Sequence, residues 1–333
     1  MADDIKVVGS AINPFEARDM IKMLQPDVLT LDVEMPKMDG IAFLENLMRL
    51  RPMPVVMVST LTTKTSEVTL KALELGAIDF VTKPSAGLQG NIGSFATEVQ
   101  EKIRIAATAN VRGLSAPTQI GAPILNKETQ SKSNNFSHII AIGASTGGTE
   151  AVRKVLAELP VDTVPVVIAQ HIPESFSASF AKRLNECCHL TVVEAANNQL
   201  ISRGYAYVAP GNNHLSIVGK KGNYRCKLDS GPKVNRHRPS VDVLFDSVNK
   251  TFQSNEIIAV ILTGVGNDGA EGLSHLNNAG VYTIAQDEAS SVVWGMPGSA
   301  VNLNAADEVL PLGKIASKLL KVPIRKASRR EGG

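Results

Sequence analysis

HIIAIGASTGGT, the stretch from His138 to Thr149, decides the fold of the second half of this chain. Its first part, Ile139 to Ile142, is a short apolar run with high β propensity, which predicts a buried strand. Glycines then turn the chain sharply, and the segment from Ala151 to Leu159 has helical spacing that stops at Pro160. A strand, a tight turn and a helix in this order are typical of an α/β domain with a parallel sheet.

The bend of this stretch carries a serine in a recognisable pattern. Gly143-x-Ser145-x-Gly147 matches a nucleophile elbow, in which glycines let the backbone bend and let a substrate approach closely. The amides that open the following helix suit a developing oxyanion. The motif alone is weak, because similar turns bind phosphate or simply pack tightly. Dinucleotide-binding spacing is absent, and Thr149 and Glu150 stand where a P-loop has Lys and Ser or Thr.

Two more polar residues follow predicted buried strands. His171 follows the run 164–170, and Asp268 lies in the glycine-rich loop after the run 257–262. Because parallel strands end at one edge of a sheet, we expect Ser145, His171 and Asp268 to converge there. A serine hydroxyl needs a base, a histidine can take its proton, and an acid fixes the imidazole tautomer. Singly, the histidine and the acid read as core, cap or turn residues; together the three residues favour a catalytic triad.

The rest of this half alternates strands with helices around a short antiparallel excursion. Strands are predicted over 191–194, 205–208, 214–218, 224–228 and 282–285, and helices over 175–187, 241–252, 271–279 and 296–303. This alternation predicts a doubly wound, mainly parallel sheet. His214, Arg236, His237 and Arg238 lie in polar loops flanked by Pro or Gly, and we expect them to line a substrate cleft. The arginines would attract an acidic partner, although exposed arginines are often only solvated.

The first half also alternates strands and helices. Strands are predicted over 5–8, 28–33, 54–58 and 79–81, and helices over 14–24, 38–50, 64–75 and 92–109. Asp32, Ser59 and Lys83 follow successive strands, so they belong at one sheet edge. An acid, a hydroxyl and a lysine suit an acceptor carboxylate, a contact to a transferred phosphoryl group and its counter-charge.

With DVEMP at 32–36 and MDG at 38–40, this half resembles a response-regulator receiver domain of flavodoxin-like fold. The resemblance implies that a histidine kinase phosphorylates Asp32 with Mg²⁺ present, and that Ser59 and Lys83 are switch residues. Receivers begin with a strand that ends in a Mg²⁺-holding acidic pair, whereas this chain starts at what resembles the second strand. We therefore expect the first strand and helix to be missing, the Mg²⁺ site to be incomplete and Asp32 to be a poor phosphoacceptor. Asp3 and Asp4 precede the segment 5–8, at the wrong end of that strand.

Composition divides the chain into four parts. We expect a receiver domain over 1–110, a flexible linker rich in Ser, Thr, Asn, Gln, Ala and Pro over 111–137, a catalytic domain over 138–325 and a basic tail over 326–333. The 333 residues are 44% hydrophobic and carry a net charge of +2, which gives no reason to expect nucleic-acid binding. The three cysteines have no metal-binding spacing, and neither a signal region nor a membrane-length apolar run is present. These features predict a cytoplasmic protein with no membrane insertion.

Several longer motifs point to one family. GASTGGTEA, AQHIP, APGNNH, NRHRPSVDVLF, LTGVGNDG and AQDEASSVVWGMP, together with the receiver half, resemble the chemotaxis protein-glutamate methylesterases. The resemblance covers nearly the whole chain except the linker and the start. It implies hydrolysis of glutamate γ-methyl esters, and deamidation of certain glutamines, on methyl-accepting chemotaxis receptors.

The same resemblance assigns roles to residues. Ser145, His171 and Asp268 would form the triad, and the backbone amides of Thr146 and Val265 would bind the oxyanion. The chemotaxis kinase would relieve restraint by the receiver, and catalysis would need no cofactor. A damaged receiver would leave the catalytic cleft uncovered or would lower abundance by misfolding. The alternative left open is a non-catalytic regulatory module of a two-component system, which binds phosphate or a partner.

Overall fold

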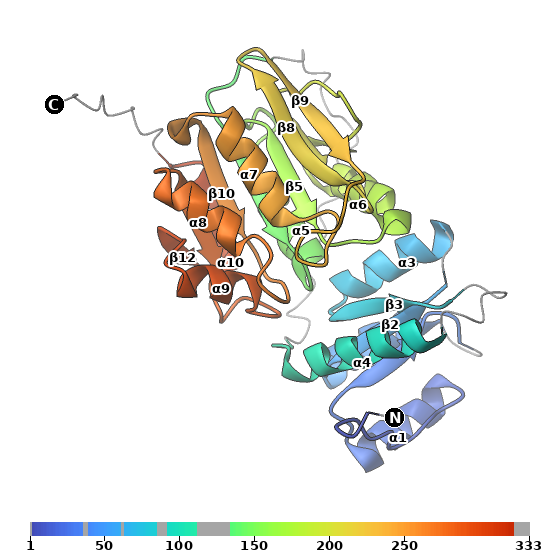
Figure 1. Cartoon of the computed structure of the whole chain (residues 1–333). Coiled ribbons are helices and arrows are strands. Elements are labelled where there is room, and N and C mark those ends of the chain that lie inside the picture. The colour runs from blue at the N-terminus through green and yellow to red at the C-terminus, as the bar shows by residue number, and fades with distance from the viewer. Residues whose placement is uncertain (1, 36–38, 61–62, 85–91, 112–133, 323–333) are drawn as a thin grey trace. The chain divides into compact units, whose positions relative to one another are not determined.

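A computed structural model gives the structure of the chain and describes residues 2–35, 39–60, 63–84, 92–111 and 134–322 (Figure 1). The chain forms two compact units, Met1–Ile120 and Gly121–Gly333. The predicted basic tail, 326–333, and most of the predicted linker, 111–137, lie outside the described residues. In the part of the chain that is described, no helix has the length and apolar character that crossing a lipid bilayer requires.

The first unit contains a parallel sheet with helices between its strands. Its elements are α1 (Pro14–Leu24), β1 (Leu29–Asp32), α2 (Gly40–Leu50), β2 (Val55–Ser59), α3 (Thr63–Glu74), β3 (Asp79–Thr82) and α4 (Ile92–Thr108). The strands lie in the order β1-β2-β3, with Asp32 opposite Val58 and Ser59 opposite Thr82. Since all three run in parallel, Asp32, Ser59 and Lys83 lie at one edge, as the α/β prediction for this half requires.

The predicted strand over 5–8 is wrong. Among the described residues this segment forms no strand, and Val7 and Val8 are 78% and 46% exposed. A strand forms only where a neighbour supplies hydrogen-bond partners for its backbone. In the flavodoxin-like order 2-1-3-4-5 the second strand pairs only with the first, and no described segment occupies that position beside β1.

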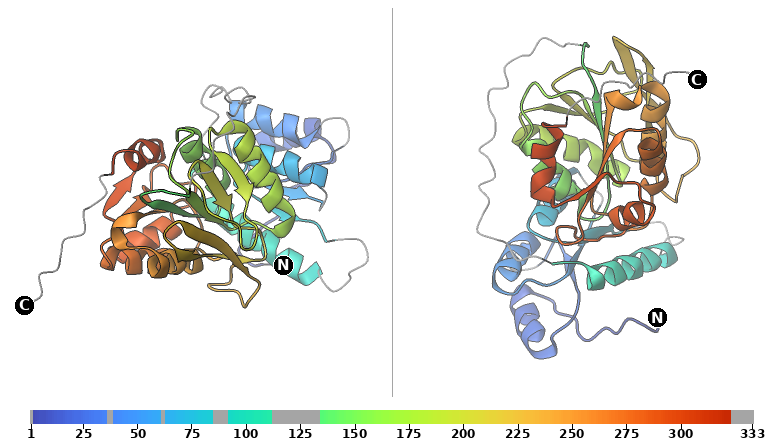
Figure 2. Two further views of the ribbon diagram at one scale, coloured as in Figure 1. Left: turned by 90° about the horizontal axis from the view of Figure 1, so that it is seen from above. Right: turned by 90° about the vertical axis from the view of Figure 1, so that its left-hand side faces the viewer.

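The second unit is built on a parallel seven-stranded sheet in the order β12-β11-β10-β4-β5-β7-β6. Its strands are β4 (Ile139–Ala144), β5 (Val166–Gln170), β6 (Thr191–Glu194), β7 (Tyr205–Val208), β10 (Ile257–Ile261), β11 (Tyr282–Gln286) and β12 (Glu308–Leu310). The helices are α5 (Gly148–Ala157), α6 (Glu174–Cys187), α7 (Val241–Thr251), α8 (Ala270–Asn278), α9 (Met296–Asn302) and α10 (Leu312–Leu319). Helices α7 and α8 cover one face, and α5, α6 and α10 cover the other (Figures 1 and 2).

The antiparallel excursion is a separate hairpin of β8 (His214–Lys220) and β9 (Asn223–Asp229). It is fastened to α7, because Ser247 Oγ accepts the Ile217 amide at 3.0 Å and Thr251 Oγ1 donates to the Ile217 carbonyl at 2.8 Å. The doubly wound, mainly parallel fold is therefore confirmed. The short last strand β12 and helix α10 were not predicted.

The centre of the sheet positions the site. All residues of β4, β5 and β10 are buried, which follows from sequences that are apolar throughout except for Gln170 at the end of β5. Strand β4 lies between the other two, with Gly143 opposite Ile261 on one side and Ala169 on the other. The residues that follow these three neighbouring strands consequently meet at one edge.

Candidate active site

Ser145 directly follows β4 at the start of a tight turn. Gly147 has a φ of 75°, which an L residue adopts at a cost, and helix α5 begins at the next residue. The Ser145 amide donates to the Thr263 carbonyl at 3.0 Å, so the turn is fastened to the segment that follows β10. Gly264 fits closely there, because a Cβ on it would lie 2.7 Å from Ser145 Cβ. The elbow is thus a strand-turn-helix unit that holds the serine at the sheet edge.

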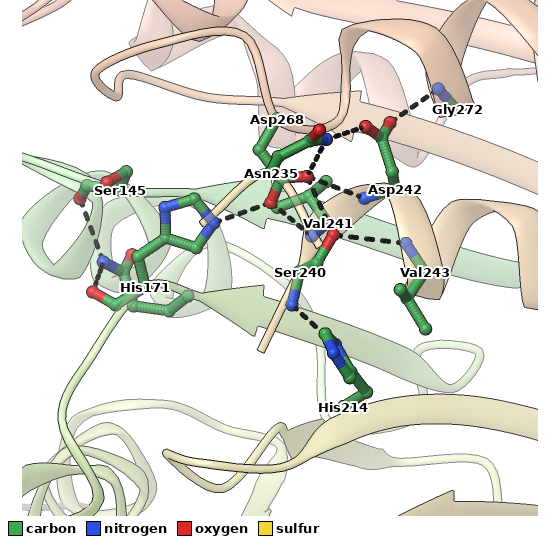
Figure 3. Close-up of polar contacts among 11 residues, drawn as sticks. Ser145, His171, His214, Asn235, Ser240, Val241, Asp242, Val243, Asp268 and Gly272 are labelled. Carbon is green, nitrogen blue, oxygen red and sulfur yellow. Dashed lines mark hydrogen bonds and ion pairs between the residues drawn. The ribbon is translucent and has the colours of Figure 1, made fainter. Parts of the chain in front are cut away.

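His171 directly follows β5 and faces an acid through one ring nitrogen. Its Nε2 lies 2.8 Å from Asp268 Oδ2, while Nδ1 is buried without a hydrogen-bond partner among the described residues. A carboxylate only accepts hydrogen bonds, so we assign the proton to Nε2, which leaves the Nδ1 lone pair free. In Figure 3 the His171 ring lies between Asp268 and Ser145. The imidazole is therefore oriented so that Nδ1 is its free accepting atom.

Between the described side chains of Ser145 and His171 no hydrogen bond is present. Their backbones are joined instead by Gln170, whose Nε2 donates to the Ser145 carbonyl at 2.9 Å and to the His171 carbonyl at 3.1 Å. Catalytic hydrogen bonds are often long in enzymes without substrate and shorten when substrate binds. Gln170 thus fixes the Ser145 and His171 segments relative to each other.

Asp268 is 1% exposed and accepts hydrogen bonds on both oxygens. The donors are His171 Nε2 (2.8 Å), Asn235 Nδ2 (2.9 Å), Ser240 Oγ (2.8 Å) and the amides of Val241 (2.7 Å) and Asp242 (3.4 Å). The last two amides open helix α7, whose positive end favours an anion. Burial raises the pKa of Asp268, but the bonds from His171, Asn235 and Val241 outweigh it and hold this pKa well below its usual range. The carboxylate therefore stays ionised and can stabilise an imidazolium.

The residues expected to line a substrate cleft differ in their surroundings. His214 is 3% exposed; its Nδ1 accepts the Ser240 amide at 3.2 Å and its Nε2 donates to the Pro232 carbonyl at 2.9 Å (Figure 3). Both ring nitrogens are thus used inside the domain, which corrects the expectation that His214 lines a cleft. It supports Ser240, the N-cap of α7, from behind.

The segment that contains Arg236, His237 and Arg238 lies over the site. The His237 ring stacks on the His171 ring, with centroids 3.7 Å apart and planes 10° apart. Arg238 bonds to Asn212 Oδ1 and to the Gly231 carbonyl, the latter at 2.6 Å, so its guanidinium fastens loops together. Arg236 is exposed, has a φ of 68° and contacts none of these groups. Asn235, which the sequence did not single out, bonds directly to Asp268.

Two backbone segments flank the serine where an oxyanion would form. Thr146 follows Ser145, and its carbonyl accepts from Thr263 Oγ1 at 3.0 Å. The Thr263 hydroxyl also accepts the amides of Val292 and Val293, so it ties three loops together. The amide of Val265, two residues on, makes no hydrogen bond to another described residue. Its availability and its place after Gly264 suit an oxyanion donor.

The phosphoacceptor candidate lies in the first unit. The Asp32 carboxylate pairs with Lys83 Nζ and accepts the Glu34 amide at 3.2 Å. Ser59 is buried, and its hydroxyl accepts from Thr69 Oγ1 at 2.9 Å and donates to the Thr60 carbonyl. The structure thus brings Asp32 and Lys83 together. The Ser59 hydroxyl bonds to Thr69 and Thr60 and to neither of these two side chains.

Mg²⁺ prefers several oxygen ligands, and a receiver supplies them mainly as carboxylates. Within the described ranges no group of three His, Cys, Asp or Glu side chains could hold a metal ion. Asp4 does not add a ligand, because its carboxylate is bonded to Arg104 at 2.7 and 2.9 Å. The described residues therefore do not fit a complete receiver Mg²⁺ site.

The sequence was compared with known families. Residues 140–319 match the CheB methylesterase family, and residues 2–89 match the response regulator receiver domain. The second match suggests a Mg²⁺-binding phosphorylation site in the first unit.

Individual proteins agree with these matches. The protein-glutamate methylesterase/protein-glutamine glutaminase of Salmonella typhi is 52% identical over 321 residues, which cover 95% of this chain and 89% of the relative. The protein-glutamate methylesterase/protein-glutamine glutaminase 2 of Saccharophagus degradans is 51% identical over 317 residues, 95% of this chain and 91% of that protein. The crystal structure of the Thermotoga maritima CheB methylesterase catalytic domain superposes with a TM-score of 0.54 at 38% identity, over 56% of this chain and 98% of that one.

Proposed function

The chain belongs to the CheB methylesterase family, and from that premise we infer that it is a protein-glutamate methylesterase and protein-glutamine glutaminase. It is a serine hydrolase that demethylates glutamate γ-methyl esters and deamidates specific glutamines on chemotaxis receptors. Its receiver domain places this activity under phosphorylation control. The observation that carries the catalytic part is the state of His171, with Nε2 bonded to Asp268 and Nδ1 buried and unpaired among the described residues.

We propose that Ser145, His171 and Asp268 act as the triad. Ser145 Oγ attacks the γ-carbonyl while His171 Nδ1 takes its proton, and Asp268 stabilises the resulting imidazolium. The tetrahedral oxyanion accepts hydrogen bonds from the amides of Thr146 and Val265. The imidazolium then protonates the leaving group, so methanol departs from an ester or ammonia from an amide. Water, deprotonated by the same histidine, hydrolyses the acyl-enzyme and restores Ser145.

This mechanism needs no metal ion or cofactor at the catalytic site. We propose that the partners are methyl-accepting chemotaxis receptors as substrate and the chemotaxis histidine kinase as phosphodonor. We place the protein in the cytoplasm, where the thiols of Cys187, Cys188 and Cys226, none of them in a disulfide, would stay reduced.

The experiment that tests the activity is release of labelled methanol from receptor fragments methylated on glutamate. The full chain should release methanol, and glutamine-bearing fragments should release ammonia. A folded chain that binds the fragments but releases neither product would instead favour the non-catalytic regulatory module.

Asp32 is the proposed phosphoacceptor, and its labelling should be weak. The acid lies beside Lys83, as a phosphorylated aspartate requires, but the described residues provide no acidic set for Mg²⁺. We expect slow labelling by a small phosphodonor such as acetyl phosphate, absent in Asp32→Asn. The measurement is acid-labile phosphate incorporation with and without Mg²⁺. Fast labelling with full Mg²⁺ dependence would contradict the expected incompleteness of the site.

We propose that Arg236 attracts acidic groups beside the scissile glutamate. It sits at a turn position with φ of 68°, where glycine is favoured, so Arg236→Gly relieves strain while it removes the charge. We expect KM for acidic receptor fragments to rise several-fold, kcat to change little and the melting temperature not to fall. The rise in KM should shrink at high salt, because screening already weakens the attraction.

Lys221→Gly is the matched control for Arg236→Gly. Lys221 lies in the turn after β8, whose seven residues span about 20 Å from His214. It is exposed and basic like Arg236, but it lies at the far end of β8. Its removal should therefore leave KM unchanged. Equal KM values for Arg236→Gly and the unmodified chain would remove Arg236 from substrate recognition.

A further inference from the structure

A second buried carboxylate lies behind Asp268. Asp242 is 8% exposed, and its Oδ1 accepts the Gly272 amide of α8 at 2.6 Å. Its Oδ2 accepts from Asn235 Nδ2 at 2.5 Å, and the same Nδ2 donates to Asp268 Oδ1 at 2.9 Å (Figure 3). One amide group therefore uses its two hydrogens on two different carboxylates. Without that bridge, the two buried carboxylates would repel each other with no shared donor between them.

The position of Asn235 is set by a tight turn. Val234 and His237 exchange both backbone hydrogen bonds, at 3.1 and 2.9 Å, and the two residues between them have φ of 49° and 68°. Positive φ at both central positions defines a type I′ turn, in which asparagine is favoured at the first. The turn sends the Asn235 amide to Asp268 and stacks the His237 ring on His171. A four-residue turn thus contacts both the acid and the base.

The orientation of the Asn235 amide depends on Asp242. An amide has a donating end and an accepting end, and Asp268 needs a donor. A carboxylate at Asp242 accepts from the NH₂ group and would repel the amide oxygen. Asp242 thereby selects the orientation in which the NH₂ group also reaches Asp268.

We propose that Asn235 and Asp242 are positioning residues of the hydrolase site. They hold Asp268 in the orientation that keeps the proton on His171 Nε2 and leaves Nδ1 for Ser145, and Asp242 adds negative charge that favours the imidazolium. This inference rests on the proposed triad and extends it by two residues that touch neither substrate nor the reacting atoms.

The charge on Asp242 gives the inference a measurable signature. Burial raises the pKa of Asp242 to about 6, with the neighbouring Asp268 charge adding to it and the Gly272, Gly269 and Asn235 bonds opposing it. Of the other titratable groups on these elements, His237 stacks on His171, while Asp246 of α7 is paired with His275 of α8 at 3.0 Å, away from Asp242 and Asp268. Above its pKa Asp242 is anionic, and that charge stabilises protonated His171.

The experiment follows kcat/KM against pH for a small glutamyl methyl ester, using the full chain. Its acid limb reports protonation of the catalytic base in the free enzyme. Asp242→Asn removes a negative charge, so the limb should move to lower pH by about half a unit. Asn235→Ala should lower kcat/KM by about tenfold. The double variant should be no worse than Asn235→Ala alone, because the two residues act as one unit.

Asp246→Asn is the control, since Asp246 lies one turn further along α7, is part-exposed and pairs with His275 instead of the site. It should leave the rate and the limb unchanged. If Asp242→Asn behaves like Asp246→Asn, or if the double variant shows the product of the single losses, the inference is overturned. A merely structural role would lower stability without moving the limb.

A second readout keeps this test separate from the proposed function. The pH dependence of Ser145 labelling by a fluorophosphonate reports the same base without any receptor substrate, and it counts only folded molecules. If the full chain releases no methanol but labels Ser145, the proposed substrate fails while the positioning role is still measured. If Asn235→Ala does not fold, Asn235→Ser, which keeps a donor at this position, takes its place and should lose less activity.

Discussion

Ser145→Ala is expected to lower turnover of a glutamyl methyl ester by about 10⁶-fold, the loss seen when a serine nucleophile is removed. The reason is the loss of the atom that forms the acyl-enzyme, since the imidazole and the oxyanion amides remain in place. The Ser145→Ala chain should fold normally, because the Ser145 hydroxyl makes no hydrogen bond to another described residue. Residual hydrolysis above the uncatalysed rate would come from the oxyanion site alone.

Two measurements check this expectation. Methanol release gives the turnover, and mass spectrometry after treatment with a fluorophosphonate gives the labelled residue. Label should appear on Ser145 in the unmodified chain and disappear in Ser145→Ala and, through loss of the base, in His171→Ala. Ser216→Ala, in the hairpin strand β8, is the control and should label at the normal rate. Normal turnover by folded Ser145→Ala would exclude Ser145 as the nucleophile.

Local sequence pattern was sufficient for the framework of the site. Strand β4 is unbroken apolar sequence, the turn after it is glycine-rich and α5 has helical spacing, so each element is encoded within a few residues. Convergence of Ser145, His171 and Asp268 then follows from the rule that parallel strands end at one edge. The structure places them in the loops that follow three neighbouring strands, β10, β4 and β5.

The contacts that support the three candidate residues could not be predicted from local sequence pattern. Asn235 and Asp268 are 33 positions apart, and His214 and Ser240 are 26 apart, so no local periodicity links them. A polar loop residue with positive φ is a weak signal that Asn235 is special. The proposed use of His171 Nδ1 rather than Nε2 as the base depends on ring orientation, which composition and spacing do not encode.

The start of the chain shows the opposite failure. Residues 5–8 have strand-like sequence, yet Val7 is 78% exposed and no strand forms there. Periodicity reports how a segment could pack, but a strand also needs a neighbour with free backbone groups. At the last strand the prediction failed by omission: β12 forms but was not predicted, because its three residues are too few to give a pattern.

Asp268→Asn should lower kcat/KM by about 10⁴-fold, as expected when a triad acid loses its charge. The surroundings explain why the amide is a poor replacement. All five groups that meet this carboxylate act as donors. Only the Ser240 hydroxyl, by rotating, and the His171 ring, by moving its proton to Nδ1, can accept instead. If the new NH₂ group takes the place of Oδ2, it faces the Val241 amide and favours His171 protonated on Nδ1, where it cannot accept from Ser145. If it takes the place of Oδ1, it faces the donor end of Asn235.

The two orientations share one loss, the negative charge that stabilises the imidazolium. The acid limb of kcat/KM should therefore move to lower pH, in the same direction as for Asp242→Asn but further, because Asp268 contacts the ring directly.

The charge on Asp268 should also affect the stability of the fold, with a definite sign. The pKa of Asp268 is depressed in the folded chain, so its ionised form stabilises the fold at pH values above about 4, the usual aspartate pKa. That stabilisation is lost as the pH falls through the depressed pKa.

Thermal unfolding of the two forms at pH 7 and in acid would separate these effects. Asp268→Asn should be less stable than the unmodified chain at neutral pH, and the difference should shrink as the pH falls below 4, where the native carboxylate begins to lose its own advantage. A constant difference at every pH would mean that shape, not charge, holds this residue in place. Full activity with an unmoved acid limb would mean that His171 obtains its basicity without Asp268.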